Sequence, residues 1–459
     1  MNMSIRRISS ETRVGPIGIG GSNPIRIQSM ATVDTNDTEG CVAQAKRIID
    51  AGGELVRFTT QGTREAENMK NISARLKADG YQTPLVADVH FTAHTADVAA
   101  LYCEKVRINP GNYVDPGRTF KHLEHTDDEY AGELKKIEAK LVPFLNICKE
   151  HHTAVRIGVN HGSLSDRIMS RYGDTPEGIV ESCMEFLRIF KRENFNDVVI
   201  SIKASNTVVM VTTVRLLVQT MDKEDMHYPL HLGVTEAGEG EDGRIKSAVG
   251  IGALLTEGIG DTIRVSLSEE PEQEIPVARK LVDMIEECVA LREEAEATIK
   301  DDTITLTLDA PDWETLQLKA AMAVGALLID RKATKLIIKN VSFEEARLIE
   351  LADSILQAAR IKFTKTEYIS CPGCGRTLYN LQETIAKIKA ATKDLVGLKI
   401  GIMGCIVNGP GEMADADYGY VGAGRGKISL YRQKVCVEKN IPESEAVEKL
   451  LELIRKDRQ

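Results

Sequence analysis

Apolar and polar positions follow a repeating order from Pro24 onward: a short apolar segment ends in polar residues, and an amphipathic helix follows it. In the segment 39–51, apolar residues recur at intervals of three and four, which indicates a helix with one buried face. The apolar segments predict eight strands, at 24–30, 55–60, 84–90, 105–109, 154–160, 197–205, 230–236 and 262–267. Eight strands alternating with helices over about 250 residues are typical of an α/β fold, the (β/α)8 barrel of the TIM type. A doubly wound open sheet has the same local pattern, and the number of strands favours the barrel.

Polar residues gather at the carboxyl ends of the predicted strands, where this fold places its chemistry. They are Gln28, Arg57, Asp88, His90, Arg107, Asn109, Arg156, Asn160, Lys203, Glu236, Arg264 and Ser266. A single charged residue at this rim would need no function, because it could simply be paired with an opposite charge. Five of these residues are cations, however, and two carboxylates are too few to balance them. Because arginine binds phosphate oxygens in bidentate fashion, the cations predict a phosphorylated small molecule, in particular a diphosphate.

The pattern changes after Leu267. A helix is predicted at 271–292, and an acidic, alanine-rich extension follows it at 293–300. Next come a strand at 303–309, a helix at 312–330 with Asp312 as its N-cap, a strand at 335–339 and a helix at 343–360. We interpret residues 288–366 as a small α/β insert or spacer. It separates a barrel domain, residues 1–287, from a C-terminal α+β domain, residues 367–459.

Two cysteine segments mark the C-terminal domain. Cys371-Pro372-Gly373-Cys374 places two thiols on one tight turn, since proline and glycine favour turns. Cys405 follows a predicted helix at 381–391 and a predicted strand at 398–403. Three thiolates with one weaker ligand are typical of an iron–sulfur cluster that leaves one iron open to substrate.

Two other interpretations of the cysteines exist. A structural zinc normally has four Cys or His ligands, but no histidine follows Cys371, and Cys436 lies in a predicted strand. A redox dithiol would not require Cys405. The sequence therefore favours a cluster over zinc, and zinc over a dithiol.

Composition limits the partners and the compartment. The net charge of −10 argues against nucleic acid as a partner. No apolar stretch approaches the length of a membrane-spanning helix, so no membrane partner is expected. The absence of a signal-peptide pattern and an odd number of cysteines, nine, predict a reducing cytoplasm. Five cysteines are expected to be inert core thiols: Cys41, Cys103, Cys148, Cys183 and Cys288.

Several segments together resemble the 4-hydroxy-3-methylbut-2-enyl diphosphate synthase family of the methylerythritol phosphate route to isoprenoids. In the barrel they are 24–30, 86–91, 107–112, 156–160, 203–205, 232–238 and 258–266. In the C-terminal domain they are the two cysteine segments, 371–377 and 404–412. The matches keep their order along both domains.

The resemblance implies a [4Fe-4S] cluster held by Cys371, Cys374, Cys405 and the carboxylate of Glu412. It implies 2-C-methyl-D-erythritol 2,4-cyclodiphosphate as substrate, opened by two electrons with loss of water. Substrate-binding residues would be Arg57, Arg107, Arg156, Asn160, Lys203, Arg264 and Ser266. Glu236 would donate a proton to the departing hydroxyl, with Asp88 and His90 nearby. Flavodoxin or ferredoxin would supply the electrons.

The insert departs from the family pattern, in which a short form lacks it and a long form carries a much larger one. An insert of about 80 residues suggests a compact spacer, well short of a barrel of about 250 residues. We therefore expect a homodimer in which the C-terminal domain of one chain closes over the barrel of the other.

Two other classes of function remain open from the sequence. One is a barrel lyase that acts on another phosphorylated substrate and carries zinc in its C-terminal domain. The other is a cluster carrier or redox sensor without enzymatic activity, which would have no use for a cationic barrel mouth.

Overall fold

The computed structural model describes residues 6–116, 119, 121–406, 411, 413 and 416–458. Eight parallel strands form one sheet in the order β8-β7-β6-β5-β4-β3-β10-β9. A bridge between Ile200 and Leu230 joins the two ends of this order, so the sheet forms the predicted barrel. The strands are β3 (Arg26–Met30), β4 (Leu55–Thr60), β5 (Leu85–Val89), β6 (Lys105–Ile108), β7 (Ala154–Asn160), β8 (Val198–Lys203), β9 (His231–Leu232) and β10 (Thr262–Ile263).

The last two barrel strands are shorter than the sequence predicts. Segments 230–236 and 262–267 were expected, but β9 and β10 contain two residues each. The chain leaves the ladder at Gly233, where a Cβ would lie 2.6 Å from the Lys203 ammonium. Glu236 then adopts a positive φ of 48°, which regular strands do not allow.

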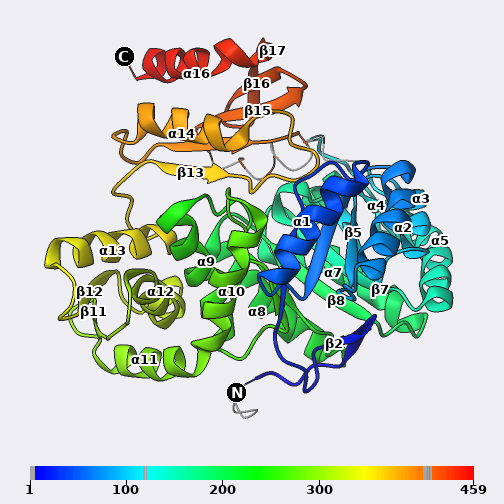
Figure 1. The fold of residues 1–459 in the computed structure, drawn as a ribbon, viewed down its shortest axis with the longest axis horizontal. Helices are drawn as coiled ribbons and strands as arrows, with labels where there is room; N and C mark the ends of the chain where they lie inside the picture. Colours follow the sequence, from blue (N-terminus) through cyan, green and yellow to red (C-terminus); the bar gives the residue numbers. More distant parts are fainter. Residues whose placement is uncertain are drawn as a thin grey trace.

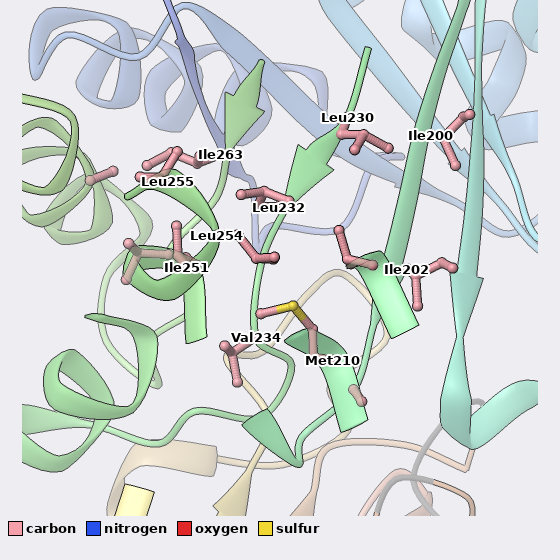
Figure 2. Close-up of a cluster of buried hydrophobic side chains, with 14 of the residues drawn as sticks. Ile200, Ile202, Met210, Leu230, Leu232, Val234, Ile251, Leu254, Leu255 and Ile263 are labelled. Atoms are coloured by element: carbon pink, nitrogen blue, oxygen red, sulfur yellow. The ribbon is translucent and has the colours of Figure 1, made fainter. Parts of the chain in front are cut away.

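Helices surround the barrel and bury its outer face. They are α1 (Thr38–Asp50), α2 (Thr63–Ala78), α3 (Ala93–Ala100), α4 (Pro110–Tyr113), α5 (Asp127–His151), α6 (Asp166–Tyr172), α7 (Pro176–Arg192), α8 (Thr207–Lys223), α9 (Gly240–Leu255) and α10 (Glu274–Asp283). Figure 2 shows one part of this core, where Ile202 and Leu232 on the strands lie near Met210 of α8 and Leu254 of α9. All four side chains are buried.

A hairpin closes the amino-terminal end of the barrel. Its strands, β1 (Thr12–Val14) and β2 (Ile17–Ile19), have three residues each and were not predicted. Val14 and Ile19 form a buried apolar cluster with Leu55, Val86, Ala154 and Val199 from the barrel strands. The barrel interior therefore opens only toward the carboxyl ends of its strands.

The insert packs against the side of the barrel. Its elements are α11 (Ile285–Ala297), β11 (Thr303–Thr307), α12 (Trp313–Ile329), β12 (Lys335–Lys339) and α13 (Glu345–Ala358). The predicted N-cap is confirmed, because the Asp312 side chain accepts a hydrogen bond of 2.9 Å from the Thr315 amide. Glycines bring α12 close to α9: a Cβ on Gly252 would lie 2.5 Å from Met322, and one on Gly325 would lie 2.8 Å from the Val249 carbonyl. Insert and barrel therefore share one hydrophobic core.

The C-terminal domain has a separate core. Its sheet has the order β13-β14-β15-β16-β17, with β13 (Glu367–Ser370), β14 (Lys399–Met403), β15 (Tyr418–Gly424), β16 (Lys427–Arg432) and β17 (Val435–Pro442). The helices α14 (Leu381–Thr392) and α16 (Glu443–Asp457) pack on it. Figure 1 shows this domain, in orange and red, over one end of the barrel, with β2 at the other end. The described part of the chain contains no helix long and apolar enough to cross a membrane.

Candidate active site

A cavity lies between the barrel mouth and the C-terminal domain. Among the residues that line it are Arg57, Asp88, His90, Arg107, Arg156, Asn160, Lys203, Glu236, Arg264, Ser266, Cys371, Cys374 and Cys405. The structure thus brings together every predicted site residue except Glu412. Glu412 lies outside the described residues.

The three thiols come from two neighbouring strand ends. Cys371 directly follows β13, and Cys405 lies two residues after the parallel strand β14. Gly373 has a φ of 80°, so the turn that carries Cys374 uses a conformation that favours glycine. The amide of Gly404 donates to the Cys371 sulfur at 3.2 Å. A donor aimed at sulfur suits an anionic thiolate, so this donor set fits an iron–sulfur cluster. The described residues contain no compact group of three or more His, Cys, Asp or Glu side chains of the kind that holds a single metal ion.

The C-terminal domain closes over the barrel of its own chain. Ser370 forms a parallel bridge with Ala237, which follows Glu236. The Ser268 hydroxyl donates to the Cys371 carbonyl at 2.9 Å. A Cβ on Gly411 would lie 1.6 Å from the Gly162 carbonyl oxygen, so the two backbones touch. Our expectation of closure onto a partner's barrel is therefore wrong. The insert folds against α9 and does not extend away from the barrel, and this brings β13 to the mouth of the same chain.

Polar contacts extend this closure along α9. Lys389 of α14 pairs with Glu239 at 3.1 Å, and Lys246 of α9 lies 3.6 Å from Glu367 of β13. Lys365 also pairs with Asp242. The C-terminal domain thus meets the barrel through ion pairs and backbone contacts, whereas the insert shares a hydrophobic core with the barrel.

Asp88 is the centre of a charged network at the mouth. Its carboxylate accepts a hydrogen bond of 2.9 Å from Arg107, and Arg57 lies 4.0 Å away. Burial alone would raise the pKa of Asp88, but Arg57 and Arg107 outweigh it and hold this pKa well below its usual range. Asp88 therefore carries a negative charge and orients the cations around it.

His90 is neutral in this network. Burial, followed by the nearby Arg107, lowers the pKa of His90 to about 3. Its Nε2 contacts the Arg107 guanidinium, and its Nδ1 lies 3.2 Å from the Asn112 amide. His90 therefore carries no positive charge in the free protein and orients neighbouring groups.

The other cations differ in how they are compensated. Arg264 makes a bidentate pair with Glu274 at 3.0 and 2.9 Å. Arg156 is 1% exposed, and its Nε and Nη1 have no hydrogen-bond partner among the described residues. Burial, and then Arg156, lower the pKa of Lys203 well below its usual range. A bound anion with several oxygens would relieve this repulsion.

Two residues at the site were missed by the sequence analysis. Arg376 lines the cavity and lies 3.7 Å from Asp88. It lies in the first cysteine segment, so its place in the sequence could have indicated that it belongs to the site. Glu274 begins α10 and orients Arg264, but no sequence pattern distinguishes it from the other acidic residues nearby. Two further polar residues predicted near the strand ends do not line this cavity: Gln28 lies inside β3, and Asn109, directly after β6, caps α4.

The thiols expected to be inert are all buried. Burial raises the pKa of Cys41 to about 12, and it likewise raises the pKa values of Cys103, Cys148, Cys183 and Cys288. These thiols stay protonated at neutral pH, which agrees with a packing role.

Comparison with known proteins identifies the family. Residues 9–279 match the model described as the GcpE TIM-barrel domain, and residues 367–456 match the GcpE protein C-terminal domain. The chain belongs to the GcpE family. A relative from Phocaeicola vulgatus, named 4-hydroxy-3-methylbut-2-en-1-yl diphosphate synthase (flavodoxin), is 53% identical over 98% of each chain. Relatives of the same name from Bacteroides thetaiotaomicron and Porphyromonas gingivalis are 52% and 45% identical, and each comparison spans at least 98% of both chains.

The relatives are longer than this chain. The comparison with the Phocaeicola vulgatus protein runs over 599 positions, whereas this chain has 459 residues, so at least 140 positions are gaps opposite this chain. Neither family model covers residues 280–366. The family and the barrel predicted from the sequence are thus confirmed.

Proposed function

We propose that this chain is a 4-hydroxy-3-methylbut-2-en-1-yl diphosphate synthase that opens 2-C-methyl-D-erythritol 2,4-cyclodiphosphate reductively. The observation that carries the proposal is one cavity in which five buried cations face three thiols. Neither a lyase with structural zinc nor a simple cluster carrier requires both sets of residues on one cavity. The family membership supports the same conclusion.

The cations of the barrel bind and orient the diphosphate. Arg57, Arg107 and Arg264 are held by carboxylates, which fix their guanidinium groups before substrate arrives. Arg156 and Lys203 complete the binding site, with Asn160 and Ser266 as neutral partners. Such preorganisation reduces the free-energy cost of ordering the site on binding.

A [4Fe-4S] cluster held by Cys371, Cys374 and Cys405, with Glu412 as the proposed fourth ligand, would supply electrons one at a time and an iron open to substrate. Ring opening breaks a carbon–oxygen bond, and the oxygen stays on the phosphate. Two electrons and one proton are consumed as the neighbouring hydroxyl leaves as water. Glu236, at the cavity wall, holds the proton for that hydroxyl.

The closed domain arrangement excludes water from this chemistry. Substrate enters when the C-terminal domain separates from the mouth, and the ionic contacts along α9 re-form afterwards.

The names of the relatives support flavodoxin as the electron donor, with ferredoxin as the second candidate. We further propose a cytoplasmic location and a homodimer in which each chain closes its own cavity.

The test is anaerobic purification followed by an absorption spectrum and by iron and sulfide analysis. We expect brown protein with about four irons per chain, and turnover of the cyclic diphosphate with reduced flavodoxin. Cys405→Ser should abolish the colour. Cys436→Ser is the matched control, because this thiol lies in β17, away from the cavity, and its loss should leave the cluster intact. Stoichiometric zinc without iron would overturn the proposal.

A further inference from the structure

A layer of polar side chains lies inside the barrel, beneath the cavity. Side chains two residues apart on a strand share a face. Met30 and Arg107 line the cavity. Gln28 lies two residues before Met30 on β3, and Lys105 lies two residues before Arg107 on β6, so Gln28 and Lys105 point into the barrel one layer lower. His231 lies on β9, two residues before Gly233, where a Cβ would point at the Lys203 ammonium inside the barrel. Gln28 and Lys105 are fully buried, and His231 is 1% exposed.

Several polar atoms of this layer lack a hydrogen-bond partner among the described residues. The Lys105 ammonium nitrogen, both polar atoms of Gln28 and the Nε2 of His231 have no hydrogen-bond partner there. The two unpartnered nitrogens of Arg156 belong to the layer above. Buried polar atoms normally form hydrogen bonds with protein or water. This many unpartnered polar atoms in one place therefore indicate a hydrated space. The apolar hairpin cluster lies below this layer, and the cavity lies above it.

The charges around Lys105 favour its neutral form in the free protein. Burial, then Arg156 on β7 and Arg57 on β4, lower the pKa of Lys105 well below its usual range. Burial, and then Lys203 and Arg156, likewise lower the pKa of His231 on β9 well below its usual range.

No carboxylate on the strands around Lys105 is available to pair with its ammonium group. On β5, Asp88 is bonded to Arg107, and on β10, Arg264 is bonded to Glu274. Gln28 on β3 and Ser201 on β8 are uncharged. In the free barrel, Lys105 is thus a neutral primary amine. An anion bound above it would favour its protonated form.

We propose that Lys105 takes up a proton when the cyclic diphosphate occupies the cavity and so adds a cation beneath its phosphates. His231 and Gln28 line the hydrated space through which this proton arrives. The inference rests on the proposed function, because it requires a diphosphate in the cavity. Lys105 acts through Arg156 and does not touch the substrate, so it is a positioning residue.

The chemistry of ring opening explains the use of such a group. Each phosphate of the cyclic substrate carries one negative charge. When the carbon–oxygen bond breaks, the terminal phosphate gains another oxyanion, and the product carries one negative charge more than the substrate. A proton taken up by Lys105 therefore compensates charge where it develops. In the free protein the same group stays neutral and does not add to the repulsion among the arginines.

The experiment is calorimetric titration of the anaerobic holoenzyme with the cyclic diphosphate in buffers of different ionisation enthalpy. The phosphates of this ligand do not titrate near neutral pH, so any buffer-dependent heat reports on the protein. We expect uptake of at least about one proton per site at a pH of about 7.5, above the ordinary range of histidine. Lys105→Met should take up about one proton fewer per site than the wild type, with Lys203 still present in both, and should bind about tenfold more weakly, the equivalent of one pKa unit. Lys105→Met should also lower kcat more than it raises KM, because the developing charge is larger than the charge of the substrate.

Lys319→Met is the matched control, because it removes a buried lysine of α12 that is paired with Glu287 outside the barrel. It should leave proton uptake unchanged. Binding of the cyclic diphosphate by the wild type without buffer-dependent heat would overturn the inference and leave the proposed function intact. Equal uptake by wild type and Lys105→Met would overturn it as well. If the wild type does not bind the cyclic diphosphate at all, the proposed function itself fails.

Discussion

Arg376 of the C-terminal domain and Asp88 of the barrel form an ion pair across the cavity, with Nη2 and Oδ2 3.7 Å apart. Both side chains are nearly inaccessible to solvent, so the attraction is weakly screened. One residue stands beside the proposed cluster ligands, and the other orients arginines of the proposed diphosphate site. The pair therefore couples closure of the C-terminal domain to the arrangement of the substrate site.

Removing this pair should weaken closure. We expect Arg376→Gln to lower kcat/KM by about ten- to a hundredfold, as for the loss of roughly 1.5–3 kcal/mol from a charged contact. Iron content should be unchanged, because the cysteines remain. Arg425→Gln, at an exposed position of the same domain, is the control. Wild-type kcat/KM in Arg376→Gln would show that the pair has no part in closure.

The backbone contact between Gly411 and Gly162 leaves no room for a side chain. In Gly411→Ala the new methyl group would overlap the Gly162 carbonyl, so the domain should not close fully. We expect a larger radius of gyration by small-angle scattering and a strong loss of turnover. Gly132→Ala adds the same methyl group where no atom lies within 4 Å, and it should behave as wild type. An unchanged radius of gyration in Gly411→Ala would contradict the observed contact.

Replacing Glu236 by Gln should separate binding from chemistry. The amide keeps the shape but cannot donate the proton, so we expect turnover to fall by about 10²–10⁴-fold. Substrate affinity should stay close to that of the wild type. Glu270→Gln, at an exposed position, serves as control. If Glu236→Gln retains wild-type turnover, another group supplies the proton.

The neutral state of His90 predicts a pH dependence of stability. An unfolded histidine binds a proton below a pKa of about 6.5, whereas His90 in the folded state does so only below about 3. Between these values the unfolded state holds one proton more, so stability falls as pH falls, by at most about 1.4 kcal/mol per pH unit. Thermal unfolding from about pH 7.5 to 5.5 should show a shallower decline for His90→Asn than for wild type. The exposed His94→Asn should not change the slope. Equal slopes for wild type and His90→Asn would mean that His90 is charged when folded.

Closure within one chain predicts the result of a mixing experiment. Glu236→Gln and Cys405→Ser chains are each expected to be inactive, since each lacks one part of the cavity. Mixed dimers should not recover activity, because every cavity contains one defect. Light scattering must first show a mass of twice 50.5 kDa, so that mixing can produce dimers at all. Partial recovery of activity would instead support closure of each C-terminal domain over the barrel of the partner chain, which the structure contradicts.

The sequence predicts the barrel well because its strands follow simple apolar patterns. Segments 55–60 and 154–160 coincide with β4 and β7. The hairpin β1–β2 was missed because three-residue strands contain too few positions to show alternation. β9 and β10 were predicted too long because their apolar residues continue after Gly233 and Ile263, where packing against α9 requires them without a ladder.

The site was predictable where residue chemistry alone indicates a role. Cations at strand ends and thiols on turns are recognisable without knowledge of the fold. Glu274 and the layer around Lys105 were not, because their importance depends on which side chains meet inside the barrel. Closure was mispredicted for a related reason. Length suggested a spacer, whereas Gly252 and Gly325 hold the insert against α9.

The separation of the C-terminal core from the core of barrel and insert has a consequence for repair after oxidative damage. The larger core, shared by barrel and insert, contains none of the cluster cysteines. The smaller core belongs to the C-terminal domain, which meets the barrel through ion pairs and backbone contacts. Loss of the cluster would therefore loosen the smaller unit and leave the larger one folded, with its binding residues in place. Reloading with iron and sulfide would then require only residues 367–459 to refold, about the size of one small domain.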